Sequence, residues 1–302
     1  MAAVMGTHVF VFGGFSTTHS DELWQYDIST GTFTLLASER RGLWGPILAS
    51  TSSAAPVARQ KHAMTSAGTR FYLFGGQTAA GMANDLWQYD TTDSTWAFLN
   101  ANLSSSSPRA RWGHAMASVG TRLFVFGGQT GQTTKSLAND LWRYDTIAST
   151  WAFLNANISG TLPSARTGHA MTSLGTRLFV FGGETASGFS DEFWEYNEDV
   201  DSCWTLVSGS NGPSARSGHA MTTMGIRVFL QGGLLGVNPS GENILSDELW
   251  EYDVLARRWT KSEPCGNPRA RYGHAMTSVA GFKILVFGGE THLGERNGCR
   301  KC

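Results

Sequence analysis

The sequence has few charged residues, no long hydrophobic run and no basic leader. Charged residues make up 16% of the 302 residues and the formal net charge is −1. Attraction of the whole molecule to nucleic acid or to an anionic membrane is therefore not expected. No apolar run approaches the roughly 20 residues that a membrane span needs, and the opening residues do not form a signal peptide. We expect neither a nucleic-acid partner nor a membrane.

Cysteine is scarce and confined to the last third of the chain, at Cys203, Cys265, Cys299 and Cys302. Four cysteines in a chain of this length do not make a disulfide framework. Cys299 and Cys302 have the spacing of a metal or redox pair, but without a second pair we interpret them as tail residues. This usage predicts a reducing, cytoplasmic setting.

Glycine and aromatic residues are abundant, and both recur with a regular order. The chain has 36 Gly, 17 Phe and 11 Trp, which suits short strands joined by tight turns. A Gly-Gly pair after an apolar run recurs at a mean interval of about 55 residues. The first glycines of these pairs are Gly13, Gly75, Gly127, Gly182, Gly232 and Gly288.

Two further elements accompany the glycine pairs. Five pairs are followed by Trp-x-Tyr and then by another aromatic residue, as in Trp142, Tyr144 and Trp151. Each later repeat opens with a basic-to-histidine element, of which Arg111 to His114 is one. The repeat therefore predicts four strands: one after the histidine, one into Gly-Gly, one at Trp-x-Tyr and one at the last aromatic residue. Four short antiparallel strands repeated radially form a propeller blade.

This pattern resembles the kelch repeat, whose period is about 50 residues. The resemblance covers residues 2–289 and implies an all-β, kelch-type β-propeller of four-stranded antiparallel blades. We expect one propeller domain over residues 1–289 and an unpatterned C-terminal tail over residues 290–302. The predicted units are 1–36, 56–99, 108–154, 163–207 and 213–261, followed by a half unit at 268–289.

The two ends of the array are irregular. No basic-to-histidine element precedes the first unit, and no Trp-x-Tyr segment follows Gly288 and Gly289. Two alternatives remain: a six-bladed ring, or a fragment of a larger propeller. The second is favoured, since the sequence begins inside a strand and an open ring leaves strand edges unpaired.

The connections that vary in length are expected on one face. From the second glycine to the next Trp they span 10 to 17 residues, and from the last aromatic to the next histidine 15 to 29. In an antiparallel blade both kinds leave on the same side, where binding residues are usual. Trp44 lies in the longest crossover, so it is a predicted contact residue, although packing onto the first blade is the alternative. The insertion 234–246 predicts either a contact loop or a simple solvated loop.

Five arginines precede the innermost strands, and they are the other predicted partner-binding residues: Arg59, Arg111, Arg166, Arg216 and Arg271. In some kelch adaptors of ubiquitin ligases, arginines at the matching place receive an acidic peptide. The resemblance thus implies a protein partner with an acidic segment. The alternative is that each arginine pairs with an aspartate near the Trp-x-Tyr strand: Asp21, Asp85, Asp140, Asp191 or Asp247.

Catalysis is not predicted, and neither a catalytic residue nor a cofactor or metal is assigned. Five histidines recur at one position of successive repeats, which indicates a structural role. The copper ligands of galactose oxidase and the Glu-x3-Asp-x3-His iron motif of kelch-type specifier proteins find no match in the sequence. The favoured function is a non-enzymatic protein-interaction scaffold. Alternatives are a carbohydrate-binding or galactose-oxidase-like propeller, or a structural module of a larger protein.

Overall fold

The computed structural model describes most of the chain, in ranges separated by short gaps. They are residues 2–15, 18–37, 55–99, 107–131, 136–155, 161–199, 203–207, 211–263, 268–279, 283–292 and 300–301. The regular elements in these ranges are antiparallel β-strands. In this part of the chain, no helix has the length and apolar character needed to cross a membrane.

The first three blades each contain four strands in sequence order from the inside outwards. Blade 1 is β1 (Ala2–Met5), β2 (His8–Phe15), β3 (His19–Asp27) and β4 (Thr32–Ala37). Blade 2 is β6 (Ala63–Ala67), β7 (Arg70–Thr78), β8 (Gly81–Asp90) and β9 (Thr95–Phe98), with β5 (Arg59–Gln60) also pairing β7. Blade 3 is β10 (Ala115–Val119), β11 (Arg122–Gln129), β12 (Leu137–Asp145) and β13 (Thr150–Phe153).

Blades 4 and 5 carry small extra sheets, and blade 6 has three described strands. Blade 4 is β15 (Ala170–Leu174), β16 (Arg177–Phe181), β19 (Phe193–Asn197) and β20 (Cys203–Leu206), with a sheet of β14 (Arg166–Thr167), β17 (Glu184–Thr185) and β18 (Gly188–Phe189). Blade 5 is β21 (Ala220–Met224), β22 (Arg227–Gln231), β25 (Leu249–Asp253) and β26 (Arg258–Ser262), with the hairpin β23 (Leu234–Val237) and β24 (Asn243–Leu245). Blade 6 is β27 (Ala275–Val279), β28 (Lys283–Phe287) and β29 (Arg300–Lys301).

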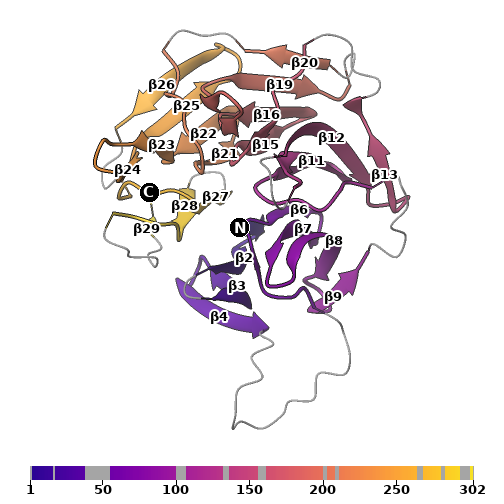
Figure 1. Cartoon of the computed structure of the whole chain (residues 1–302). Helices are drawn as coiled ribbons and strands as arrows, with labels where there is room; N and C mark the ends of the chain where they lie inside the picture. The colour runs from indigo at the N-terminus through magenta and orange to yellow at the C-terminus, as the bar shows by residue number, and fades with distance from the viewer. Residues whose placement is uncertain are drawn as a thin grey trace.

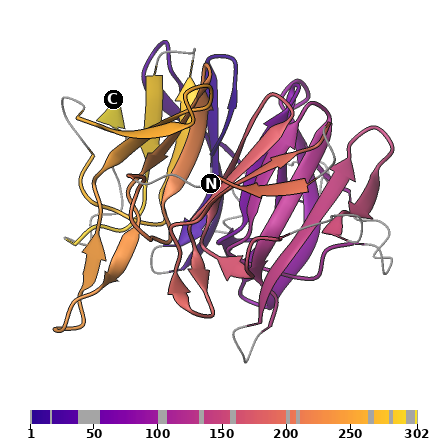
Figure 2. The ribbon, with the colours of Figure 1, turned by 90° about the horizontal axis from the view of Figure 1, so that it is seen from above.

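The innermost strands close into a six-membered ring. Each of β1, β6, β10, β15 and β21 contacts the innermost strand of the next blade, and β27 contacts β1. Figure 1 shows the blades arranged around the centre, and Figure 2 shows them edge-on. The predicted kelch-type propeller is therefore confirmed. The described residues form six blades, and β27 of blade 6 contacts β1 of blade 1.

The second strand of each blade is buried on both sides because it lies between two neighbouring blades. In β11, the run Leu123 to Gly128 is buried without interruption. The pairing of β11 with β12 shifts between Phe126 and Gly128, which produces a bulge at Gly127. A Cβ on Gly127 would lie 2.8 Å from His169 Cε1 of the next blade, so this position requires glycine.

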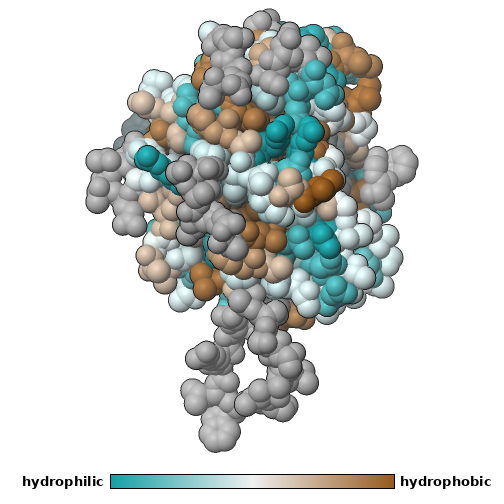
Figure 3. All heavy atoms as spheres, turned by 90° about the vertical axis from the view of Figure 1, so that its right-hand side faces the viewer, coloured by the Kyte–Doolittle hydropathy of each residue, from teal (hydrophilic) through white to brown (hydrophobic). Residues whose placement is uncertain are grey.

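The hydrophobic core is divided among the seams between blades. In five of the six seams, an aromatic residue of the outermost strand packs on a phenylalanine of the preceding blade, as Trp204 does on Phe126 with ring centroids 5.1 Å apart. The equivalent pairs are Phe12–Trp96, Phe74–Trp151, Phe181–Trp259 and, across the closure, Phe287–Phe33. Aromatic contacts of this kind bury much apolar area and fix the angle between blades. Figure 3 shows hydrophobic residues as separated patches on one side of the molecule.

Candidate functional site

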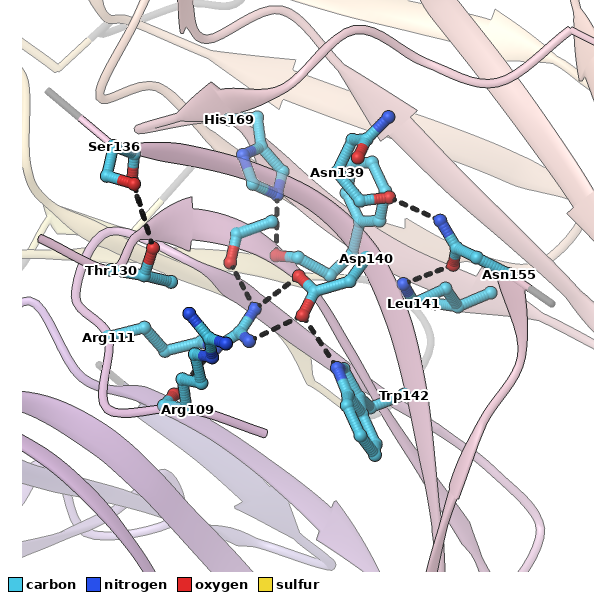
Figure 4. Close-up of polar contacts among 12 residues, drawn as sticks. Arg109, Arg111, Thr130, Ser136, Asn139, Asp140, Leu141, Trp142, Asn155 and His169 are labelled. Atoms are coloured by element: carbon cyan, nitrogen blue, oxygen red, sulfur yellow. Dashed lines mark hydrogen bonds and ion pairs between the residues drawn. The ribbon is translucent and has the colours of Figure 1, made fainter. Parts of the chain in front are cut away.

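The predicted arginines lie where the crossovers enter the innermost strands, but their side chains point into the blades. In blade 3, Arg111 donates from Nη1 to the Gly127 carbonyl oxygen (2.8 Å) and to Asp140 Oδ1 (2.7 Å), and from Nη2 to Asp140 Oδ2 (2.7 Å; Figure 4). The second carboxylate oxygen also accepts a hydrogen bond from Trp142 Nε1 at 2.7 Å. Through Arg111, the crossover that enters blade 3 is bound to Gly127 of β11 and, by a bidentate ion pair, to Asp140 of β12.

The electrostatics of this pair follow from its geometry. Burial would raise the pKa of Asp140, but the hydrogen bonds and the attraction of Arg111 outweigh burial and leave the pKa below its usual value of 3.8. The carboxylate is therefore ionised at neutral pH, and it neutralises a guanidinium that is 0% exposed.

The same contact recurs in blades 2, 4 and 5. Arg59 binds both oxygens of Asp85 at 2.6 and 2.7 Å, and Arg216 binds Glu248 at 2.8 Å. Arg166 donates to Glu192. Each arginine also donates to the carbonyl oxygen of the first glycine of its own blade's pair; Arg271 of blade 6 makes this contact with Gly288 at 2.7 Å.

The alternative predicted for the arginines, pairing with a nearby acid, is confirmed for Asp85 and Asp140. In blades 4 and 5 the prediction misses the partner by one residue, because Glu192 and Glu248 replace Asp191 and Asp247. The acid must stand two residues before the Trp, since period-two alternation then places both side chains on one face of the strand. In blade 1 this position is Glu22, which accepts from Trp24 Nε1 at 3.0 Å.

The residues after the arginines, rather than the arginines themselves, form the rim of the central channel. Their main chains make a belt of hydrogen bonds from blade to blade. Gly113 N donates to Lys61 O (3.0 Å), Gly168 N to Gly113 O (2.8 Å), Gly218 N to Gly168 O (2.8 Å) and Gly273 N to Gly218 O (2.7 Å). The belt holds the side chains of the variable position next to each glycine, which are Trp112, Thr167, Ser217 and Tyr272, with Gln60 and Lys61 in blade 2.

Lys61 differs from its counterparts in the other blades. It has a φ of 53° at a position where blades 3 to 6 have glycine, a conformation that costs an L-residue about 1 kcal/mol or more. Its Nζ lies 4.1 Å from the ring centroid of Trp112, within cation–π range. Partial burial lowers the pKa of Lys61, and the charge of Glu184 in blade 4 acts in the opposite direction. Lys61 thus combines a left-handed backbone conformation with a cation held over an aromatic ring of the next blade.

Further loops reach the same side of the disc. The connection between the second and third strands of an antiparallel blade leaves on the side where the crossover enters. The predicted insertion 234–246 is there, and it forms the hairpin β23–β24 instead of a structureless loop. Asn238 closes its tip by accepting from Ser240 N and Glu242 N at 3.0 and 2.8 Å. Val237, next to Asn238, is 58% exposed. The other predicted contact residue, Trp44, lies outside the described residues.

The repeated histidines belong to the seams. His169 is buried, lies edge-on to Phe126 of the preceding blade, and has Nε2 3.2 Å from the Phe126 carbonyl oxygen. Burial lowers the pKa of His169 to about 3, as it does for His114 and His274. The neutral imidazoles of His114 and His169 therefore donate Nε2–H to a carbonyl oxygen of the preceding blade, and this supports the structural role expected for these residues.

The described residues contain no cluster of three His, Cys, Asp or Glu side chains that could hold a metal ion. The sequence-based prediction did not single out Lys61, Trp112 and Tyr272. Trp112 and Tyr272 occupy the x position of the Arg-x-Gly-His element, which changes from blade to blade, and Lys61 stands where the other copies of the element have glycine.

Comparison with known proteins agrees with this fold. Two overlapping stretches, residues 1–157 and 99–289, match the family described as the KLHDC2/KLHL20/DRC7 Kelch-repeats domain. Kelch domain-containing protein 3 of Bos taurus is 23% identical over 300 residues, covering 95% of this chain and 76% of that protein. Kelch repeat-containing protein 2 of Saccharomyces cerevisiae is 33% identical over 252 residues, covering 78% of this chain and 27% of that protein.

A third relative has a name that states an activity. N-(sulfonatooxy)prop-2-enimidothioate sulfolyase of Thlaspi arvense is 28% identical over 255 residues, covering 78% of this chain and 71% of that protein. Other relatives are much longer than the region they share, since the chain spans 16% and 9% of two of them.

Proposed function

Since this chain belongs to the kelch-repeat family, we propose that it is a non-enzymatic scaffold that binds a protein partner on the face carrying the channel rim. One observation carries the proposal. The same main-chain hydrogen bond recurs from blade to blade, while the side chains beside it differ, above all Lys61, Trp112 and Tyr272. A rigid frame with exchangeable residues is how repeat folds present binding surfaces. Trp and Tyr are also among the side chains that contribute most at protein interfaces.

The partner chemistry we propose is an extended protein segment with an acidic residue. The sequence predicted the arginines for this role. The guanidinium groups of Arg111 and Arg216 instead donate their hydrogen bonds to carboxylates and glycine carbonyl oxygens of their own blades. Lys61 is an exposed cation of the rim, and its ammonium group is already oriented by Trp112. In this proposal the arginines act indirectly, by fixing the crossovers that carry the rim residues.

The non-enzymatic part of the proposal rests on the placement of the repeated histidines. Their imidazoles are buried in seams and have strongly lowered pKa values, which removes them from acid–base chemistry at the surface. We further propose a cytoplasmic location, on the basis of the sparse cysteines alone.

A second candidate is a lyase activity related to that named for the Thlaspi arvense protein, which matches over most of its length. The Glu-x3-Asp-x3-His motif of iron-binding specifier proteins has no copy in this sequence, so the scaffold is preferred. Incubating the purified protein and ferrous iron with an N-sulfonatooxy thioimidate distinguishes the two candidates. Turnover above that of free iron would favour the lyase.

The test of the scaffold is quantitative affinity capture from cell extract with a Trp112→Ala/Tyr272→Ala variant. The matched control is Ile147→Ser/Leu255→Ser, which changes two exposed apolar residues in the turns between the third and fourth strands, on the opposite face. All three proteins must first unfold cooperatively at similar temperatures. We expect the rim variant to lose specific partners that the control keeps. Equal capture by both variants would contradict the proposal.

A further inference from the structure

The face opposite the channel rim, which we call the underside, carries the turns between the first and second strands and between the third and fourth strands of each blade. In blade 5 these two turns hold Ile226 and Leu255, which are 50% and 75% exposed. The position of Ile226 is a threonine in each of the first four blades: Thr7, Thr69, Thr121 and Thr176. Blade 5 therefore departs from the repeat by exposing an apolar side chain.

The change to apolar residues extends to the contact between the two turns. In blade 2, Thr91 Oγ1 donates to the Thr69 carbonyl oxygen at 2.8 Å and ties the turns together. In blade 5 the position of Thr91 is Val254, which is buried and whose backbone N donates to the Ile226 carbonyl oxygen at 3.4 Å. The turns that carry Ile226 and Leu255 thus adjoin each other, and their exposed apolar side chains belong to one region of the surface.

Two arginines end the second of these turns. Arg257 and Arg258 are both exposed, and they occupy positions where blades 2 and 3 have serine and threonine: Ser94, Thr95, Ser149 and Thr150. Arg257 has a φ of 52°, a left-handed conformation that carries strain in an L-residue. Its Nη1 lies 3.8 Å from Glu195 Oε2, which is longer than a hydrogen bond. The long, charged side chain at this strained position is therefore not explained by a hydrogen bond to Glu195.

The carboxylates of this region already have partners. Asp253 Oδ1 accepts hydrogen bonds from two backbone N–H groups of its own turn, at 2.9 and 2.8 Å. Glu251 pairs with Arg227 at 2.7 Å, and Glu195 pairs with Arg177 at 3.2 Å. The two exposed arginines therefore set the charge next to the exposed apolar side chains.

We propose that these four residues, the underside patch of Ile226, Leu255, Arg257 and Arg258, bind an acidic segment of a protein partner. The segment places a large apolar side chain against Ile226 and Leu255, and its carboxylates pair with the two arginines. A planar guanidinium matches a carboxylate in shape and charge, and arginine is among the residues that contribute most at interfaces. Adjoining exposed apolar side chains beside such charges are typical of interaction sites.

Ile147 of blade 3 provides a comparison within the same chain. It is 80% exposed at the position of Leu255, but the residues that follow it in the turn are Ala148, Ser149 and Thr150. A single exposed apolar residue without a charged neighbour in its turn is ordinary for a protein surface. The proposal is therefore confined to blade 5.

Two other occupants fit the underside less well. An anionic membrane lying across this face would also meet Asp93 of blade 2 and Asp199 of blade 4, which are both exposed. A second copy of this chain in a two-fold contact would bring the same arginines against each other. An acidic polypeptide segment that contacts blade 5 alone avoids both kinds of repulsion.

The test gives blade 5 the residues that blade 2 has at the same positions, by combining Ile226→Thr, Leu255→Thr, Arg257→Ser and Arg258→Thr. This combined variant should fold, because the new residues already occupy these turns in blade 2. The matched control is Ile147→Thr, which removes an equally exposed apolar residue from blade 3. Cooperative unfolding at similar temperatures is checked for both variants first.

The probe is a phage-displayed library of random peptides, selected on the Trp112→Ala/Tyr272→Ala protein so that peptides specific for the channel rim are not recovered. We expect the enriched peptides to combine Asp or Glu with a large apolar residue. Synthetic copies should bind the unmodified protein and Ile147→Thr alike, and the combined variant on the order of tenfold more weakly. Added salt should weaken their binding to the unmodified protein.

Three results would overturn the proposal. The first is that no enriched peptide distinguishes the unmodified protein from the combined variant, or that the enriched peptides are not acidic. The second is that vesicles of phosphatidylcholine and phosphatidylserine bind the unmodified protein but not the combined variant, which would identify a membrane. The third is self-association in sedimentation that the combined variant loses, which would identify a second copy. All three leave the channel rim to its own test, since the patch lies on the other face.

Discussion

Arg111 and Asp140 face each other in parallel, with Nη1–Oδ1 and Nη2–Oδ2 distances of 2.7 Å each, and the guanidinium is completely buried. The pair joins the crossover entering blade 3 to its third strand. Because equivalent pairs occur in blades 2, 4 and 5, this contact carries much of the regularity of the propeller. We expect this buried pair to contribute more to the free energy of unfolding than the exposed ion pairs do.

We expect Asp140→Ala to lower the free energy of unfolding by about 3–5 kcal/mol, because it leaves the buried Arg111 charge without its counterion. The comparison variant is Arg70→Ala. Arg70 is half-exposed and pairs with Asp90, so the expected loss in the free energy of unfolding is about 0–1 kcal/mol. Urea denaturation followed by tryptophan fluorescence measures both. Similar losses in the two variants would contradict the structural role of the buried pair.

Gln231 occupies the position at which four other blades have a buried phenylalanine: Phe12, Phe74, Phe126 and Phe181. It is 1% exposed, and neither its Oε1 nor its Nε2 has a hydrogen-bond partner within the described structure. An unsatisfied buried polar group costs about 1–3 kcal/mol. Gln231→Leu should therefore raise the free energy of unfolding by a similar amount. The reverse change, Phe181→Gln, should lower the free energy of unfolding. If Gln231→Leu also lowers it, the side-chain amide of Gln231 has a hydrogen-bond partner and the prediction is wrong.

The seam histidines predict a loss of stability in acid. Burial lowers the pKa of His114, His169 and His274 to about 3, against an ordinary value of 6.5. Between these values the unfolded chain binds protons that the folded chain does not, so stability is full above pH 6.5 and falls as the pH drops towards 3. Each of these histidines contributes about 1.4 kcal/mol per pH unit inside that window.

Denaturation curves at pH 7, 6, 5 and 4 measure this slope. His169→Gln keeps a donor for the Phe126 carbonyl and removes one titrating ring, so its slope should be smaller by about 1.4 kcal/mol per pH unit. An unchanged slope would mean that His169 is not neutralised by folding.

Lys61→Gly separates stability from binding. Glycine relieves the left-handed conformation and matches blades 3 to 6, so the free energy of unfolding should rise or stay constant, by up to about 1 kcal/mol. Partner capture should fall because the rim loses its cation. Lys61→Arg is the control that keeps the charge. Unchanged capture by the glycine variant would remove Lys61 from the proposed contact surface.

Much of the architecture could be predicted because a propeller is local in sequence. Gly-Gly, Trp-x-Tyr and the spaced aromatic residue each define one strand of a unit, so the four-strand order of blade 3 followed directly from the segment around Arg111 to Trp151. The acid that pairs with each arginine was predicted correctly in blades 2 and 3. It was wrong by one residue in blades 4 and 5, where adjacent acids, such as Asp191 and Glu192, made the strand face ambiguous.

The sequence by itself determined the repeat, the blade and the structural role of the histidines, because each depends on residues within about one unit of one another. Only the tertiary structure decided that six innermost strands close into a ring. It also decided that Lys61 of blade 2 lies over the ring of Trp112 of blade 3. The physical reason is that these outcomes depend on contacts between blades. The main-chain belt that joins Lys61 to Gly113, and Gly113 to the blades that follow, is a set of hydrogen bonds that no single repeat encodes.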